Sequence, residues 1–258
     1  EPEEARYLAR IMLENLRIGI GEGTVRDALD DAFLDGENSQ EVQRAYDYSN
    51  DFRKVASATR KGLEALNDID LKLNRPVNSM LAQKVDTIEE GFETVGKPAA
   101  VDFKYDGLRA QIHLKNGEAK IFTRRLENVT EQFPDVKAYV EENIDAENCI
   151  IDSEIVGVRD GEVIPFQQLS KRIKRKYEIE KLRNQIPVEV RPFDLIYLEE
   201  SLMSRPYKER WNELESIVET NENLKLVDRT VTSSEEEVND MQQESLSQDH
   251  EGVMMKSL

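Results

Sequence analysis

The sequence predicts an α+β protein, in which a helical N-terminal segment is followed by a domain built on antiparallel sheets. Apolar residues in the first 70 or so positions recur at helical spacing, as in Leu8, Ile11 and Met12. Beyond them, short runs alternate apolar and polar residues around Asn116-Gly117 and Asp160-Gly161, dipeptides typical of tight hairpin turns. Strands joined by hairpins and mixed with helices are typical of α+β domains.

The expected elements follow from these patterns in chain order. Residues 1–75 are expected to form helices, and "NRPVNSM", residues 74–80, marks a linker because Pro76 and its polar neighbours break the helical pattern. We expect a second domain over residues 76–258. Its strands are expected at 108–114, 119–123, 149–158, 162–166, 188–198 and 224–231, and its helices at 206–219 and 233–246.

Composition excludes several classes of protein. The 258 residues contain no apolar run long enough to span a membrane, and the N-terminus does not resemble a signal peptide. The single cysteine, Cys149, has no partner for an internal disulfide, so a cytoplasmic location is expected. A net charge of −18 argues against non-specific adhesion to nucleic acid or anionic membranes. It suits either ordinary solubility or a high-salt cytoplasm.

One segment departs from this acidic composition. Residues 171–183, "KRIKRKYEIEKLR", concentrate basic side chains against only two acids. Such a run can contact DNA phosphates without reading sequence, or it can be a solvated helix face. We favour DNA contact for Lys171, Arg172, Lys174 and Arg175.

The stretch "VDFKYDGLRAQIH", residues 101–113, places a lysine, an Asp-Gly turn and an arginine together. A lysine becomes a nucleophile only after it loses its proton, which burial or nearby positive charge favours. Lys104, with Arg109 nearby, could therefore attack an electrophile such as a nucleotide α-phosphate. The pattern K-x-D-G alone is weak, because it arises by chance in roughly one chain of this length in twenty.

Five further segments in the same order make the pattern specific. The chain resembles the ATP-dependent DNA ligases of the archaeal and eukaryotic replicative type, through "FKYDGLRAQIH", "IFTRRLENVT", "IIDSEIVG", "FQQLSKRIKRK", "PFDLIYL" and "EGVMMK". The N-terminal "EARYLARIMLENLRIGIGEGTVRDALDDAF" is similar to the end of that family's DNA-binding domain. The resemblance covers nearly the whole chain.

The resemblance implies a role for each aligned residue. Lys104 is expected to carry AMP, and Arg109, at the arginine of the same motif, is expected to belong to the nucleotide site. Arg124 is expected at phosphate, Glu154 at the ribose and Phe193 stacked on adenine. Glu251, together with Glu154, is expected near a divalent ion, normally Mg²⁺. Arg17, in the stretch "LRIG", is expected to contact DNA.

Two departures from the family pattern stand out. Asp102 occupies a position where relatives carry a glutamate that accepts from the adenine amino group, so the acceptor here is one methylene shorter. The sequence also stops at Leu258, before the family's lysine-rich last motif and OB-fold domain. We therefore expect residues 1–75 to be the C-terminal part of a helical DNA-binding domain. Residues 76–258 would be a truncated adenylation, or nucleotidyltransferase, domain, so the chain would be a fragment.

The implied reaction seals nicks in duplex DNA. Lys104 takes AMP from ATP, the AMP passes to the 5′-phosphate at the nick, and the 3′-hydroxyl then displaces it. Two alternatives stay open: another lysyl-nucleotidyl transferase, such as an RNA ligase or capping enzyme, or a fragment that only binds nicked DNA. The expected partners are nicked DNA and a sliding clamp, with no membrane, and the expected state is a monomer.

Overall fold

The computed structural model describes residues 2–12, 19–175 and 177–258, and the chain divides into two compact units, Glu1–Asp70 and Leu71–Leu258. Each unit has its own hydrophobic core. Residues 71–75, expected in the first domain, belong instead to the second unit. The predicted DNA contact Arg17 lies outside the described residues.

The first unit is helical in its described part, as the apolar spacing predicts. Its core contains Val42, Ala45, Val55 and Leu66, all fully buried. The side chain of Asp51 caps one helix by accepting from two backbone N–H groups of the first turn. The helices are α1 (Pro2–Met12), α2 (Glu22–Phe33), α3 (Ser39–Ser49), α4 (Phe52–Thr59) and α5 (Leu63–Asn67).

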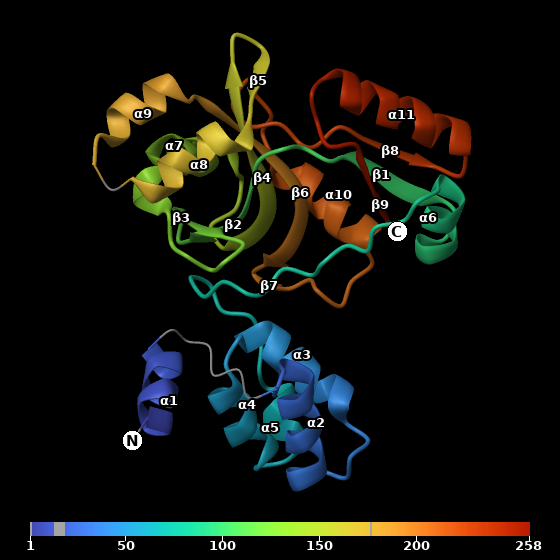
Figure 1. The fold of residues 1–258 in the computed structure, drawn as a ribbon. Helices are drawn as coiled ribbons and strands as arrows, with labels where there is room; N and C mark the ends of the chain where they lie inside the picture. Colours follow the sequence, from blue (N-terminus) through green and yellow to red (C-terminus); the bar gives the residue numbers. More distant parts are fainter. Residues whose placement is uncertain (1, 13–18, 176) are drawn as a thin grey trace. The chain divides into compact units, whose positions relative to one another are not determined.

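The second unit contains two antiparallel sheets, so the α+β fold class is confirmed (Figure 1). A three-stranded sheet has the order β8-β1-β9, formed by β1 (Ala99–Phe103), β8 (Arg229–Thr232) and β9 (Val253–Lys256). A larger sheet has the order β3-β2-β4-β6-β7, with β5 paired to β4. Its strands are β2 (Leu108–Lys115), β3 (Glu118–Thr123), β4 (Cys149–Arg159), β5 (Glu162–Ile164), β6 (Val188–Leu198) and β7 (Glu200–Ser201).

Helices cover both sheets. Figure 1 shows α10 between the two sheets, and α6 with α11 on the far side of the three-stranded sheet. On the larger sheet, α7 packs against β3 and β6, and α8 packs against β2 and β4. These helices are α6 (Ile88–Val95), α7 (Pro134–Asn143), α8 (Phe166–Lys174), α9 (Ile179–Gln185), α10 (Tyr207–Ile217) and α11 (Glu235–Ser247), with a 3₁₀ turn at Thr130–Gln132.

The two predicted hairpins are confirmed. Asn116 and Gly117 have φ of 52° and 74°, and Asp160 and Gly161 have φ of 54° and 84°. Two successive positive φ angles are what a type I′ turn requires. The strand expected at 224–231 is wrong in part, because only Arg229–Thr232 pairs as β8. Residues 224–227 lie beside β6 instead, where the chain passes from one sheet to the other.

The predicted linker at 74–80 is tied to the second unit through one face of β2. Asn74 N–H donates to His113 Nδ1 at 3.0 Å, and Val77 N–H donates to Gln111 Oε1 at 2.9 Å. Gln111 Nε2 donates back to the Val77 carbonyl at 3.0 Å. Burial lowers the pKa of His113 to about 3, so its ring is neutral and Nδ1 can accept. This segment also reaches the candidate active site, since Arg109 Nη1 donates to the Met80 carbonyl.

Within the described ranges, every helix is too short or too polar to cross a membrane.

Candidate active site

Lys104 follows directly after β1, and its backbone is fixed by the segment that precedes β9. Lys104 N–H donates to the Gly252 carbonyl and Glu251 N–H donates to the Lys104 carbonyl, both at 2.8 Å. The Lys104 ammonium forms an ion pair with the Glu251 carboxylate. Their side chains are 43% and 45% exposed, so both are open to a substrate. Motifs some 150 residues apart therefore meet at the predicted nucleophile.

The Asp-Gly turn joins this lysine to the larger sheet. A Cβ on Gly107 would lie 2.5 Å from the Ile155 carbonyl oxygen and 2.9 Å from Glu154 Cγ, so only glycine fits. Asp106 accepts from the backbone N–H of Phe166, the first residue of α8. The turn therefore needs glycine because it packs tightly on β4, and it needs aspartate to hold the start of α8.

Arg109 and Glu154 are paired across strands β2 and β4. Arg109 is held in place by Asp152, which accepts from its Nε at 3.2 Å and its Nη2 at 2.7 Å. Its guanidinium carbon also lies 5.4 Å from the centre of the Phe193 ring. Strands β2, β4 and β6 thus bring three predicted site residues, Arg109, Glu154 and Phe193, to one place.

Glu154 has the most perturbed acidity of the predicted site residues. Burial raises its pKa to about 8, and the positive charge of Arg109 opposes that rise. Asp152 and Asp106 raise it further, while Lys104 lowers it. A carboxyl group in this setting stays protonated near neutral pH, and it can then donate a hydrogen bond to a hydroxyl as well as accept one.

Asp102 lies in β1 and is 2% exposed. Its Oδ2 is 2.5 Å from Lys256 Nζ and accepts from the Tyr207 hydroxyl at 3.1 Å. Its Oδ1 has no hydrogen-bond partner among the described residues. Lys256 Nζ also lies 4.8 Å from the centre of the half-buried Phe193 ring. A free carboxylate oxygen and an aromatic ring within reach of the same lysine are suited to a purine with an exocyclic amino group.

The remaining predicted contacts divide into exposed and buried side chains. Arg124 is exposed in the loop after β3. Lys171, Lys174 and Arg175 are exposed at the end of α8, and we call these three the basic helix end. The prediction for Arg172 is wrong. Its side chain is 1% exposed and cannot reach a phosphate.

The Arg172 side chain instead lies on the buried face of α8. Its two terminal nitrogens donate to the Asp135 carboxylate at 2.9 and 2.6 Å, and also to the backbone carbonyls of Ile186 and Gln132. Adjacent residues of a helix point to different faces, whereas residues three or four apart share a face. Lys171 and Lys174 share the exposed face, and the residue next to Lys171 turns inward.

The side chains of this site suit a divalent ion that binds together with a nucleotide better than a metal ion held by protein ligands alone. In the described part of the chain, no three His, Cys, Asp or Glu side chains come together as metal ligands. Glu251 supplies carboxylate oxygens, the ligand type that Mg²⁺ prefers, and Glu154 can supply more once a bound ion displaces its proton. Mg²⁺ commonly keeps waters and substrate phosphates as its other ligands. These residues therefore fit the predicted ion when phosphate is present.

Three residues that hold this site were not predicted. Asp152 fixes Arg109, and Lys256 and Tyr207 hold Asp102. Asp152 lies two residues before Glu154, so strand alternation could have placed both on one face. Lys256 ends the segment "EGVMMK" but gives no pairing signal on its own. Tyr207 could not have been found, because it lies 105 positions from Asp102 along the chain.

Comparison with known proteins gives two family matches. The ATP dependent DNA ligase domain matches residues 79–258, and the DNA ligase N terminus matches residues 1–30. Among solved structures, mycobacterial DNA ligase D with ATP and MES is 21% identical over 62% of this chain and 48% of its own, with a TM-score of 0.46. The Chlorella virus DNA ligase-adenylate has a TM-score of 0.48 at 16% identity, over 72% of this chain and 61% of its own. Because both TM-scores are below 0.5, the family assignment depends on the sequence matches alone.

Curated relatives match along the whole chain. The DNA ligase of Nanoarchaeum equitans is 41% identical over 100% of this chain and 46% of its own length. That of Methanopyrus kandleri is 42% identical over 100% of this chain and 47% of its own. The chain spans about half the length of these relatives. One domain match covers most of this sequence, and the relatives align along the whole of this chain, so the chain belongs to the ATP-dependent DNA ligase family.

Proposed function

We propose that this protein seals nicks in duplex DNA with ATP, and that the second unit carries the adenylation step. The observation that supports it most is the position of Lys104, which is half-exposed, ion-paired to Glu251 and one turn away from the Arg109–Glu154 pair. The first unit would be part of a DNA-binding domain. Both assignments agree with the family matches over residues 1–30 and 79–258.

The first step forms a bond between Lys104 Nζ and the α-phosphorus of ATP, and pyrophosphate leaves. Glu251 contacts the ammonium and is a direct acceptor for the proton that the amine must lose. Arg109, fixed by Asp152, offers a rigid positive charge to the phosphate, and Arg124 offers a second one from its exposed loop. Asp102 Oδ1 would accept from the adenine amino group, while Phe193 would stack on the ring.

A divalent ion, which we propose to be Mg²⁺, would be held by Glu154 and Glu251 together with the phosphates. When bound, it neutralises charge that develops on phosphate oxygens during the displacement. Glu154 would also contact the ribose from the strand face that it shares with Asp152.

DNA would contact the basic helix end, Lys171, Lys174 and Arg175. These side chains project from an otherwise acidic protein and are exposed, so they can meet phosphates without selecting a sequence. Such an activity suits the cytoplasm, where the buried free Cys149 stays reduced.

The experiment is the intact mass of the 258-residue chain and of the full-length protein, before and after incubation with ATP and Mg²⁺. Lys104→Ala, a GTP sample and a nicked RNA duplex are run beside them. We expect a gain of one AMP with ATP alone, absent in Lys104→Ala, and transfer of that AMP to nicked DNA in preference to nicked RNA.

If the full-length protein gains no AMP, the proposed function is wrong. A gain from GTP, or transfer to RNA instead of DNA, would assign the same lysine to a capping-type or RNA-joining enzyme.

A further inference from the structure

Tyr105 lies between the nucleophile Lys104 and the Asp-Gly turn, and its side chain is only 6% exposed. Its hydroxyl donates to Asp228 Oδ2 at 2.6 Å and accepts from the Asp228 backbone N–H at 3.2 Å. The Asp228 carbonyl in turn accepts from the Phe103 N–H at 2.9 Å. Three hydrogen bonds therefore connect one residue, Asp228, to both chain neighbours of Lys104.

The Tyr105 ring also contacts side chains from two further segments. Its centre lies 4.5 Å from that of the His250 ring and 5.1 Å from the guanidinium carbon of Arg191. His250 directly precedes Glu251, the ion-pair partner of Lys104. Lys104 and Glu251 are thus held near each other twice, by their own backbone hydrogen bonds and by the ring contact between the residues beside them.

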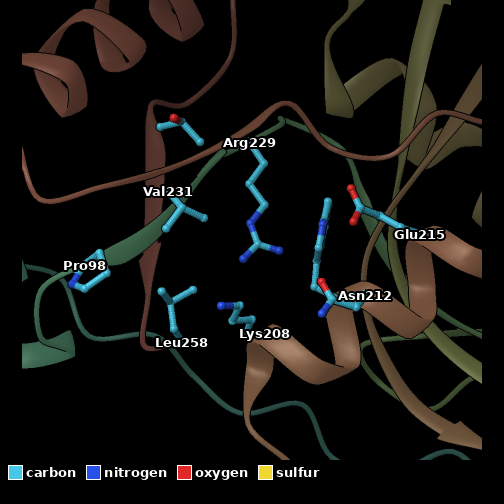
Figure 2. A pocket seen from close by; sticks show the side chains of 9 residues that line it. Pro98, Lys208, Asn212, Glu215, Arg229, Val231 and Leu258 are labelled. Carbon is cyan, nitrogen blue, oxygen red and sulfur yellow. The ribbon is translucent and has the colours of Figure 1, made fainter.

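Asp228 is a firm attachment point, because the residues around it are fixed. Arg229, the next residue and the first of β8, is 7% exposed, and its guanidinium carbon lies 4.1 Å from the centre of the Trp211 ring. Figure 2 shows the Arg229 side chain extending from the start of β8 toward α10. Arg191 Nη1, from β6, lies 3.6 Å from Asp228 Oδ2. The residue that holds Tyr105 is therefore connected to both sheets.

We propose that Tyr105 is a positioning residue for adenylation, which fixes the Lys104 amine relative to Glu251 through its bond to Asp228 and its contact with His250. This inference rests on the proposed function. In that step the Lys104 amine gives a proton to Glu251, the bond from Nζ to the α-phosphorus forms, and the bond from that phosphorus to pyrophosphate breaks. Displacing a reacting group by about 1 Å can cost roughly 10²-fold in rate, so the backbone that carries Lys104 must be held closely.

The test measures the rate at which the full-length protein gains AMP in a single turnover, over a range of ATP concentrations with Mg²⁺ and without DNA. Tyr105→Phe removes only the hydroxyl, and Asp228→Ala removes its acceptor at a side chain that is 59% exposed. We expect the rate at saturating ATP to fall roughly fivefold to twentyfold in each variant, and the ATP concentration at half-maximal rate to stay within about twofold. Misplaced reacting groups predict this loss of rate without loss of ATP binding, whereas a purely structural role does not.

A double variant and a matched control isolate the hydrogen bond. Because both substitutions remove the same bond, Tyr105→Phe combined with Asp228→Ala should be no slower than the slower single variant. Tyr197→Phe removes a hydroxyl bond of 2.8 Å to the Glu199 carbonyl and should leave the rate unchanged. Circular dichroism shows whether each variant is folded at the assay temperature.

The outcomes separate this inference from the proposed function. Single variants that gain AMP at the wild-type rate, or a double variant whose loss is the product of the two single losses, would overturn the role of Tyr105 and leave the proposed function in place. A wild type that gains no AMP would refute the proposed function itself, and the role of Tyr105 with it.

Discussion

At the scale of single residues, Glu154 shows how position decides chemistry. Its sequence context, an acid in an apolar strand, indicates only that a partner is needed. In the structure it lies beneath the glycine turn, where burial raises its pKa to about 8. A raised pKa in the folded state makes the protonated form the stable one. Its contribution to stability is therefore complete below about pH 4.5 and is lost as the pH rises through about 8.

This predicts the behaviour of Glu154→Gln. The variant should match the wild type near pH 5 and exceed its free energy of unfolding near pH 9, on the order of 2–4 kcal/mol, because the buried charge is gone. Denaturant unfolding followed by Trp211 emission measures this in the second unit. Glu147→Gln, an exposed control, should show no such pH dependence. Equal stability of wild type and Glu154→Gln at both pH values would contradict the assignment.

Arg172 gives a second prediction at this scale. Since it forms a buried ion pair with Asp135, Arg172→Met should cost about 3–5 kcal/mol of unfolding free energy by leaving a buried carboxylate unpaired. Lys171→Met, the adjacent exposed residue, should change stability by less than about 0.5 kcal/mol. Urea unfolding of the pair measures the difference. If both variants were equally stable, the inward position of Arg172 would be wrong.

At the scale of elements, β2 has two different functions on one face. Arg109, Gln111 and His113 alternate along it, and each bonds the backbone of segment 74–80. The first of them also belongs to the candidate active site. Segment 74–80, which resembles a linker in the sequence, is therefore hydrogen-bonded along β2 and supports the candidate active site through Arg109.

Gln111→Met tests the attachment of segment 74–80. It removes both hydrogen bonds to Val77 and leaves a buried N–H and carbonyl unpaired, which should cost about 2–4 kcal/mol of unfolding free energy. Gln185→Met, exposed at the end of α9, is the matched control and should be near neutral. Thermal or denaturant unfolding compares the two. A neutral Gln111→Met would show that segment 74–80 is held by other contacts.

At the scale of the whole molecule, a net charge of −18 coexists with a proposed DNA surface. Only locally concentrated cations can hold DNA on such a chain, and each phosphate contact releases counterions. Replacing Lys171, Lys174 and Arg175 together with glutamine should reduce the slope of log affinity against log salt concentration by roughly 2–3. Binding of a nicked duplex across a range of NaCl concentrations measures it. Lys115→Gln, an exposed lysine on a hairpin, should leave the slope unchanged, and an unchanged slope in the triple variant would place the DNA elsewhere.

The sequence alone determined what depends on local order along the chain. Alternation and the Asn-Gly and Asp-Gly dipeptides predict both hairpins, because turn geometry is set by the residues within the turn. Apolar spacing predicts α10 and α11, and the ordered motifs identify the family. These features need only neighbours within a few residues.

Tertiary structure decided what depends on residues far apart in the chain. It buried Arg172 on Asp135 and joined Asp102 to Tyr207 and Lys256. It also began the strand expected at 224–231 only at Arg229, because residues 224–227 lie beside β6. Such contacts bring together side chains from separate elements, and local sequence pattern carries no information about which distant group will lie opposite.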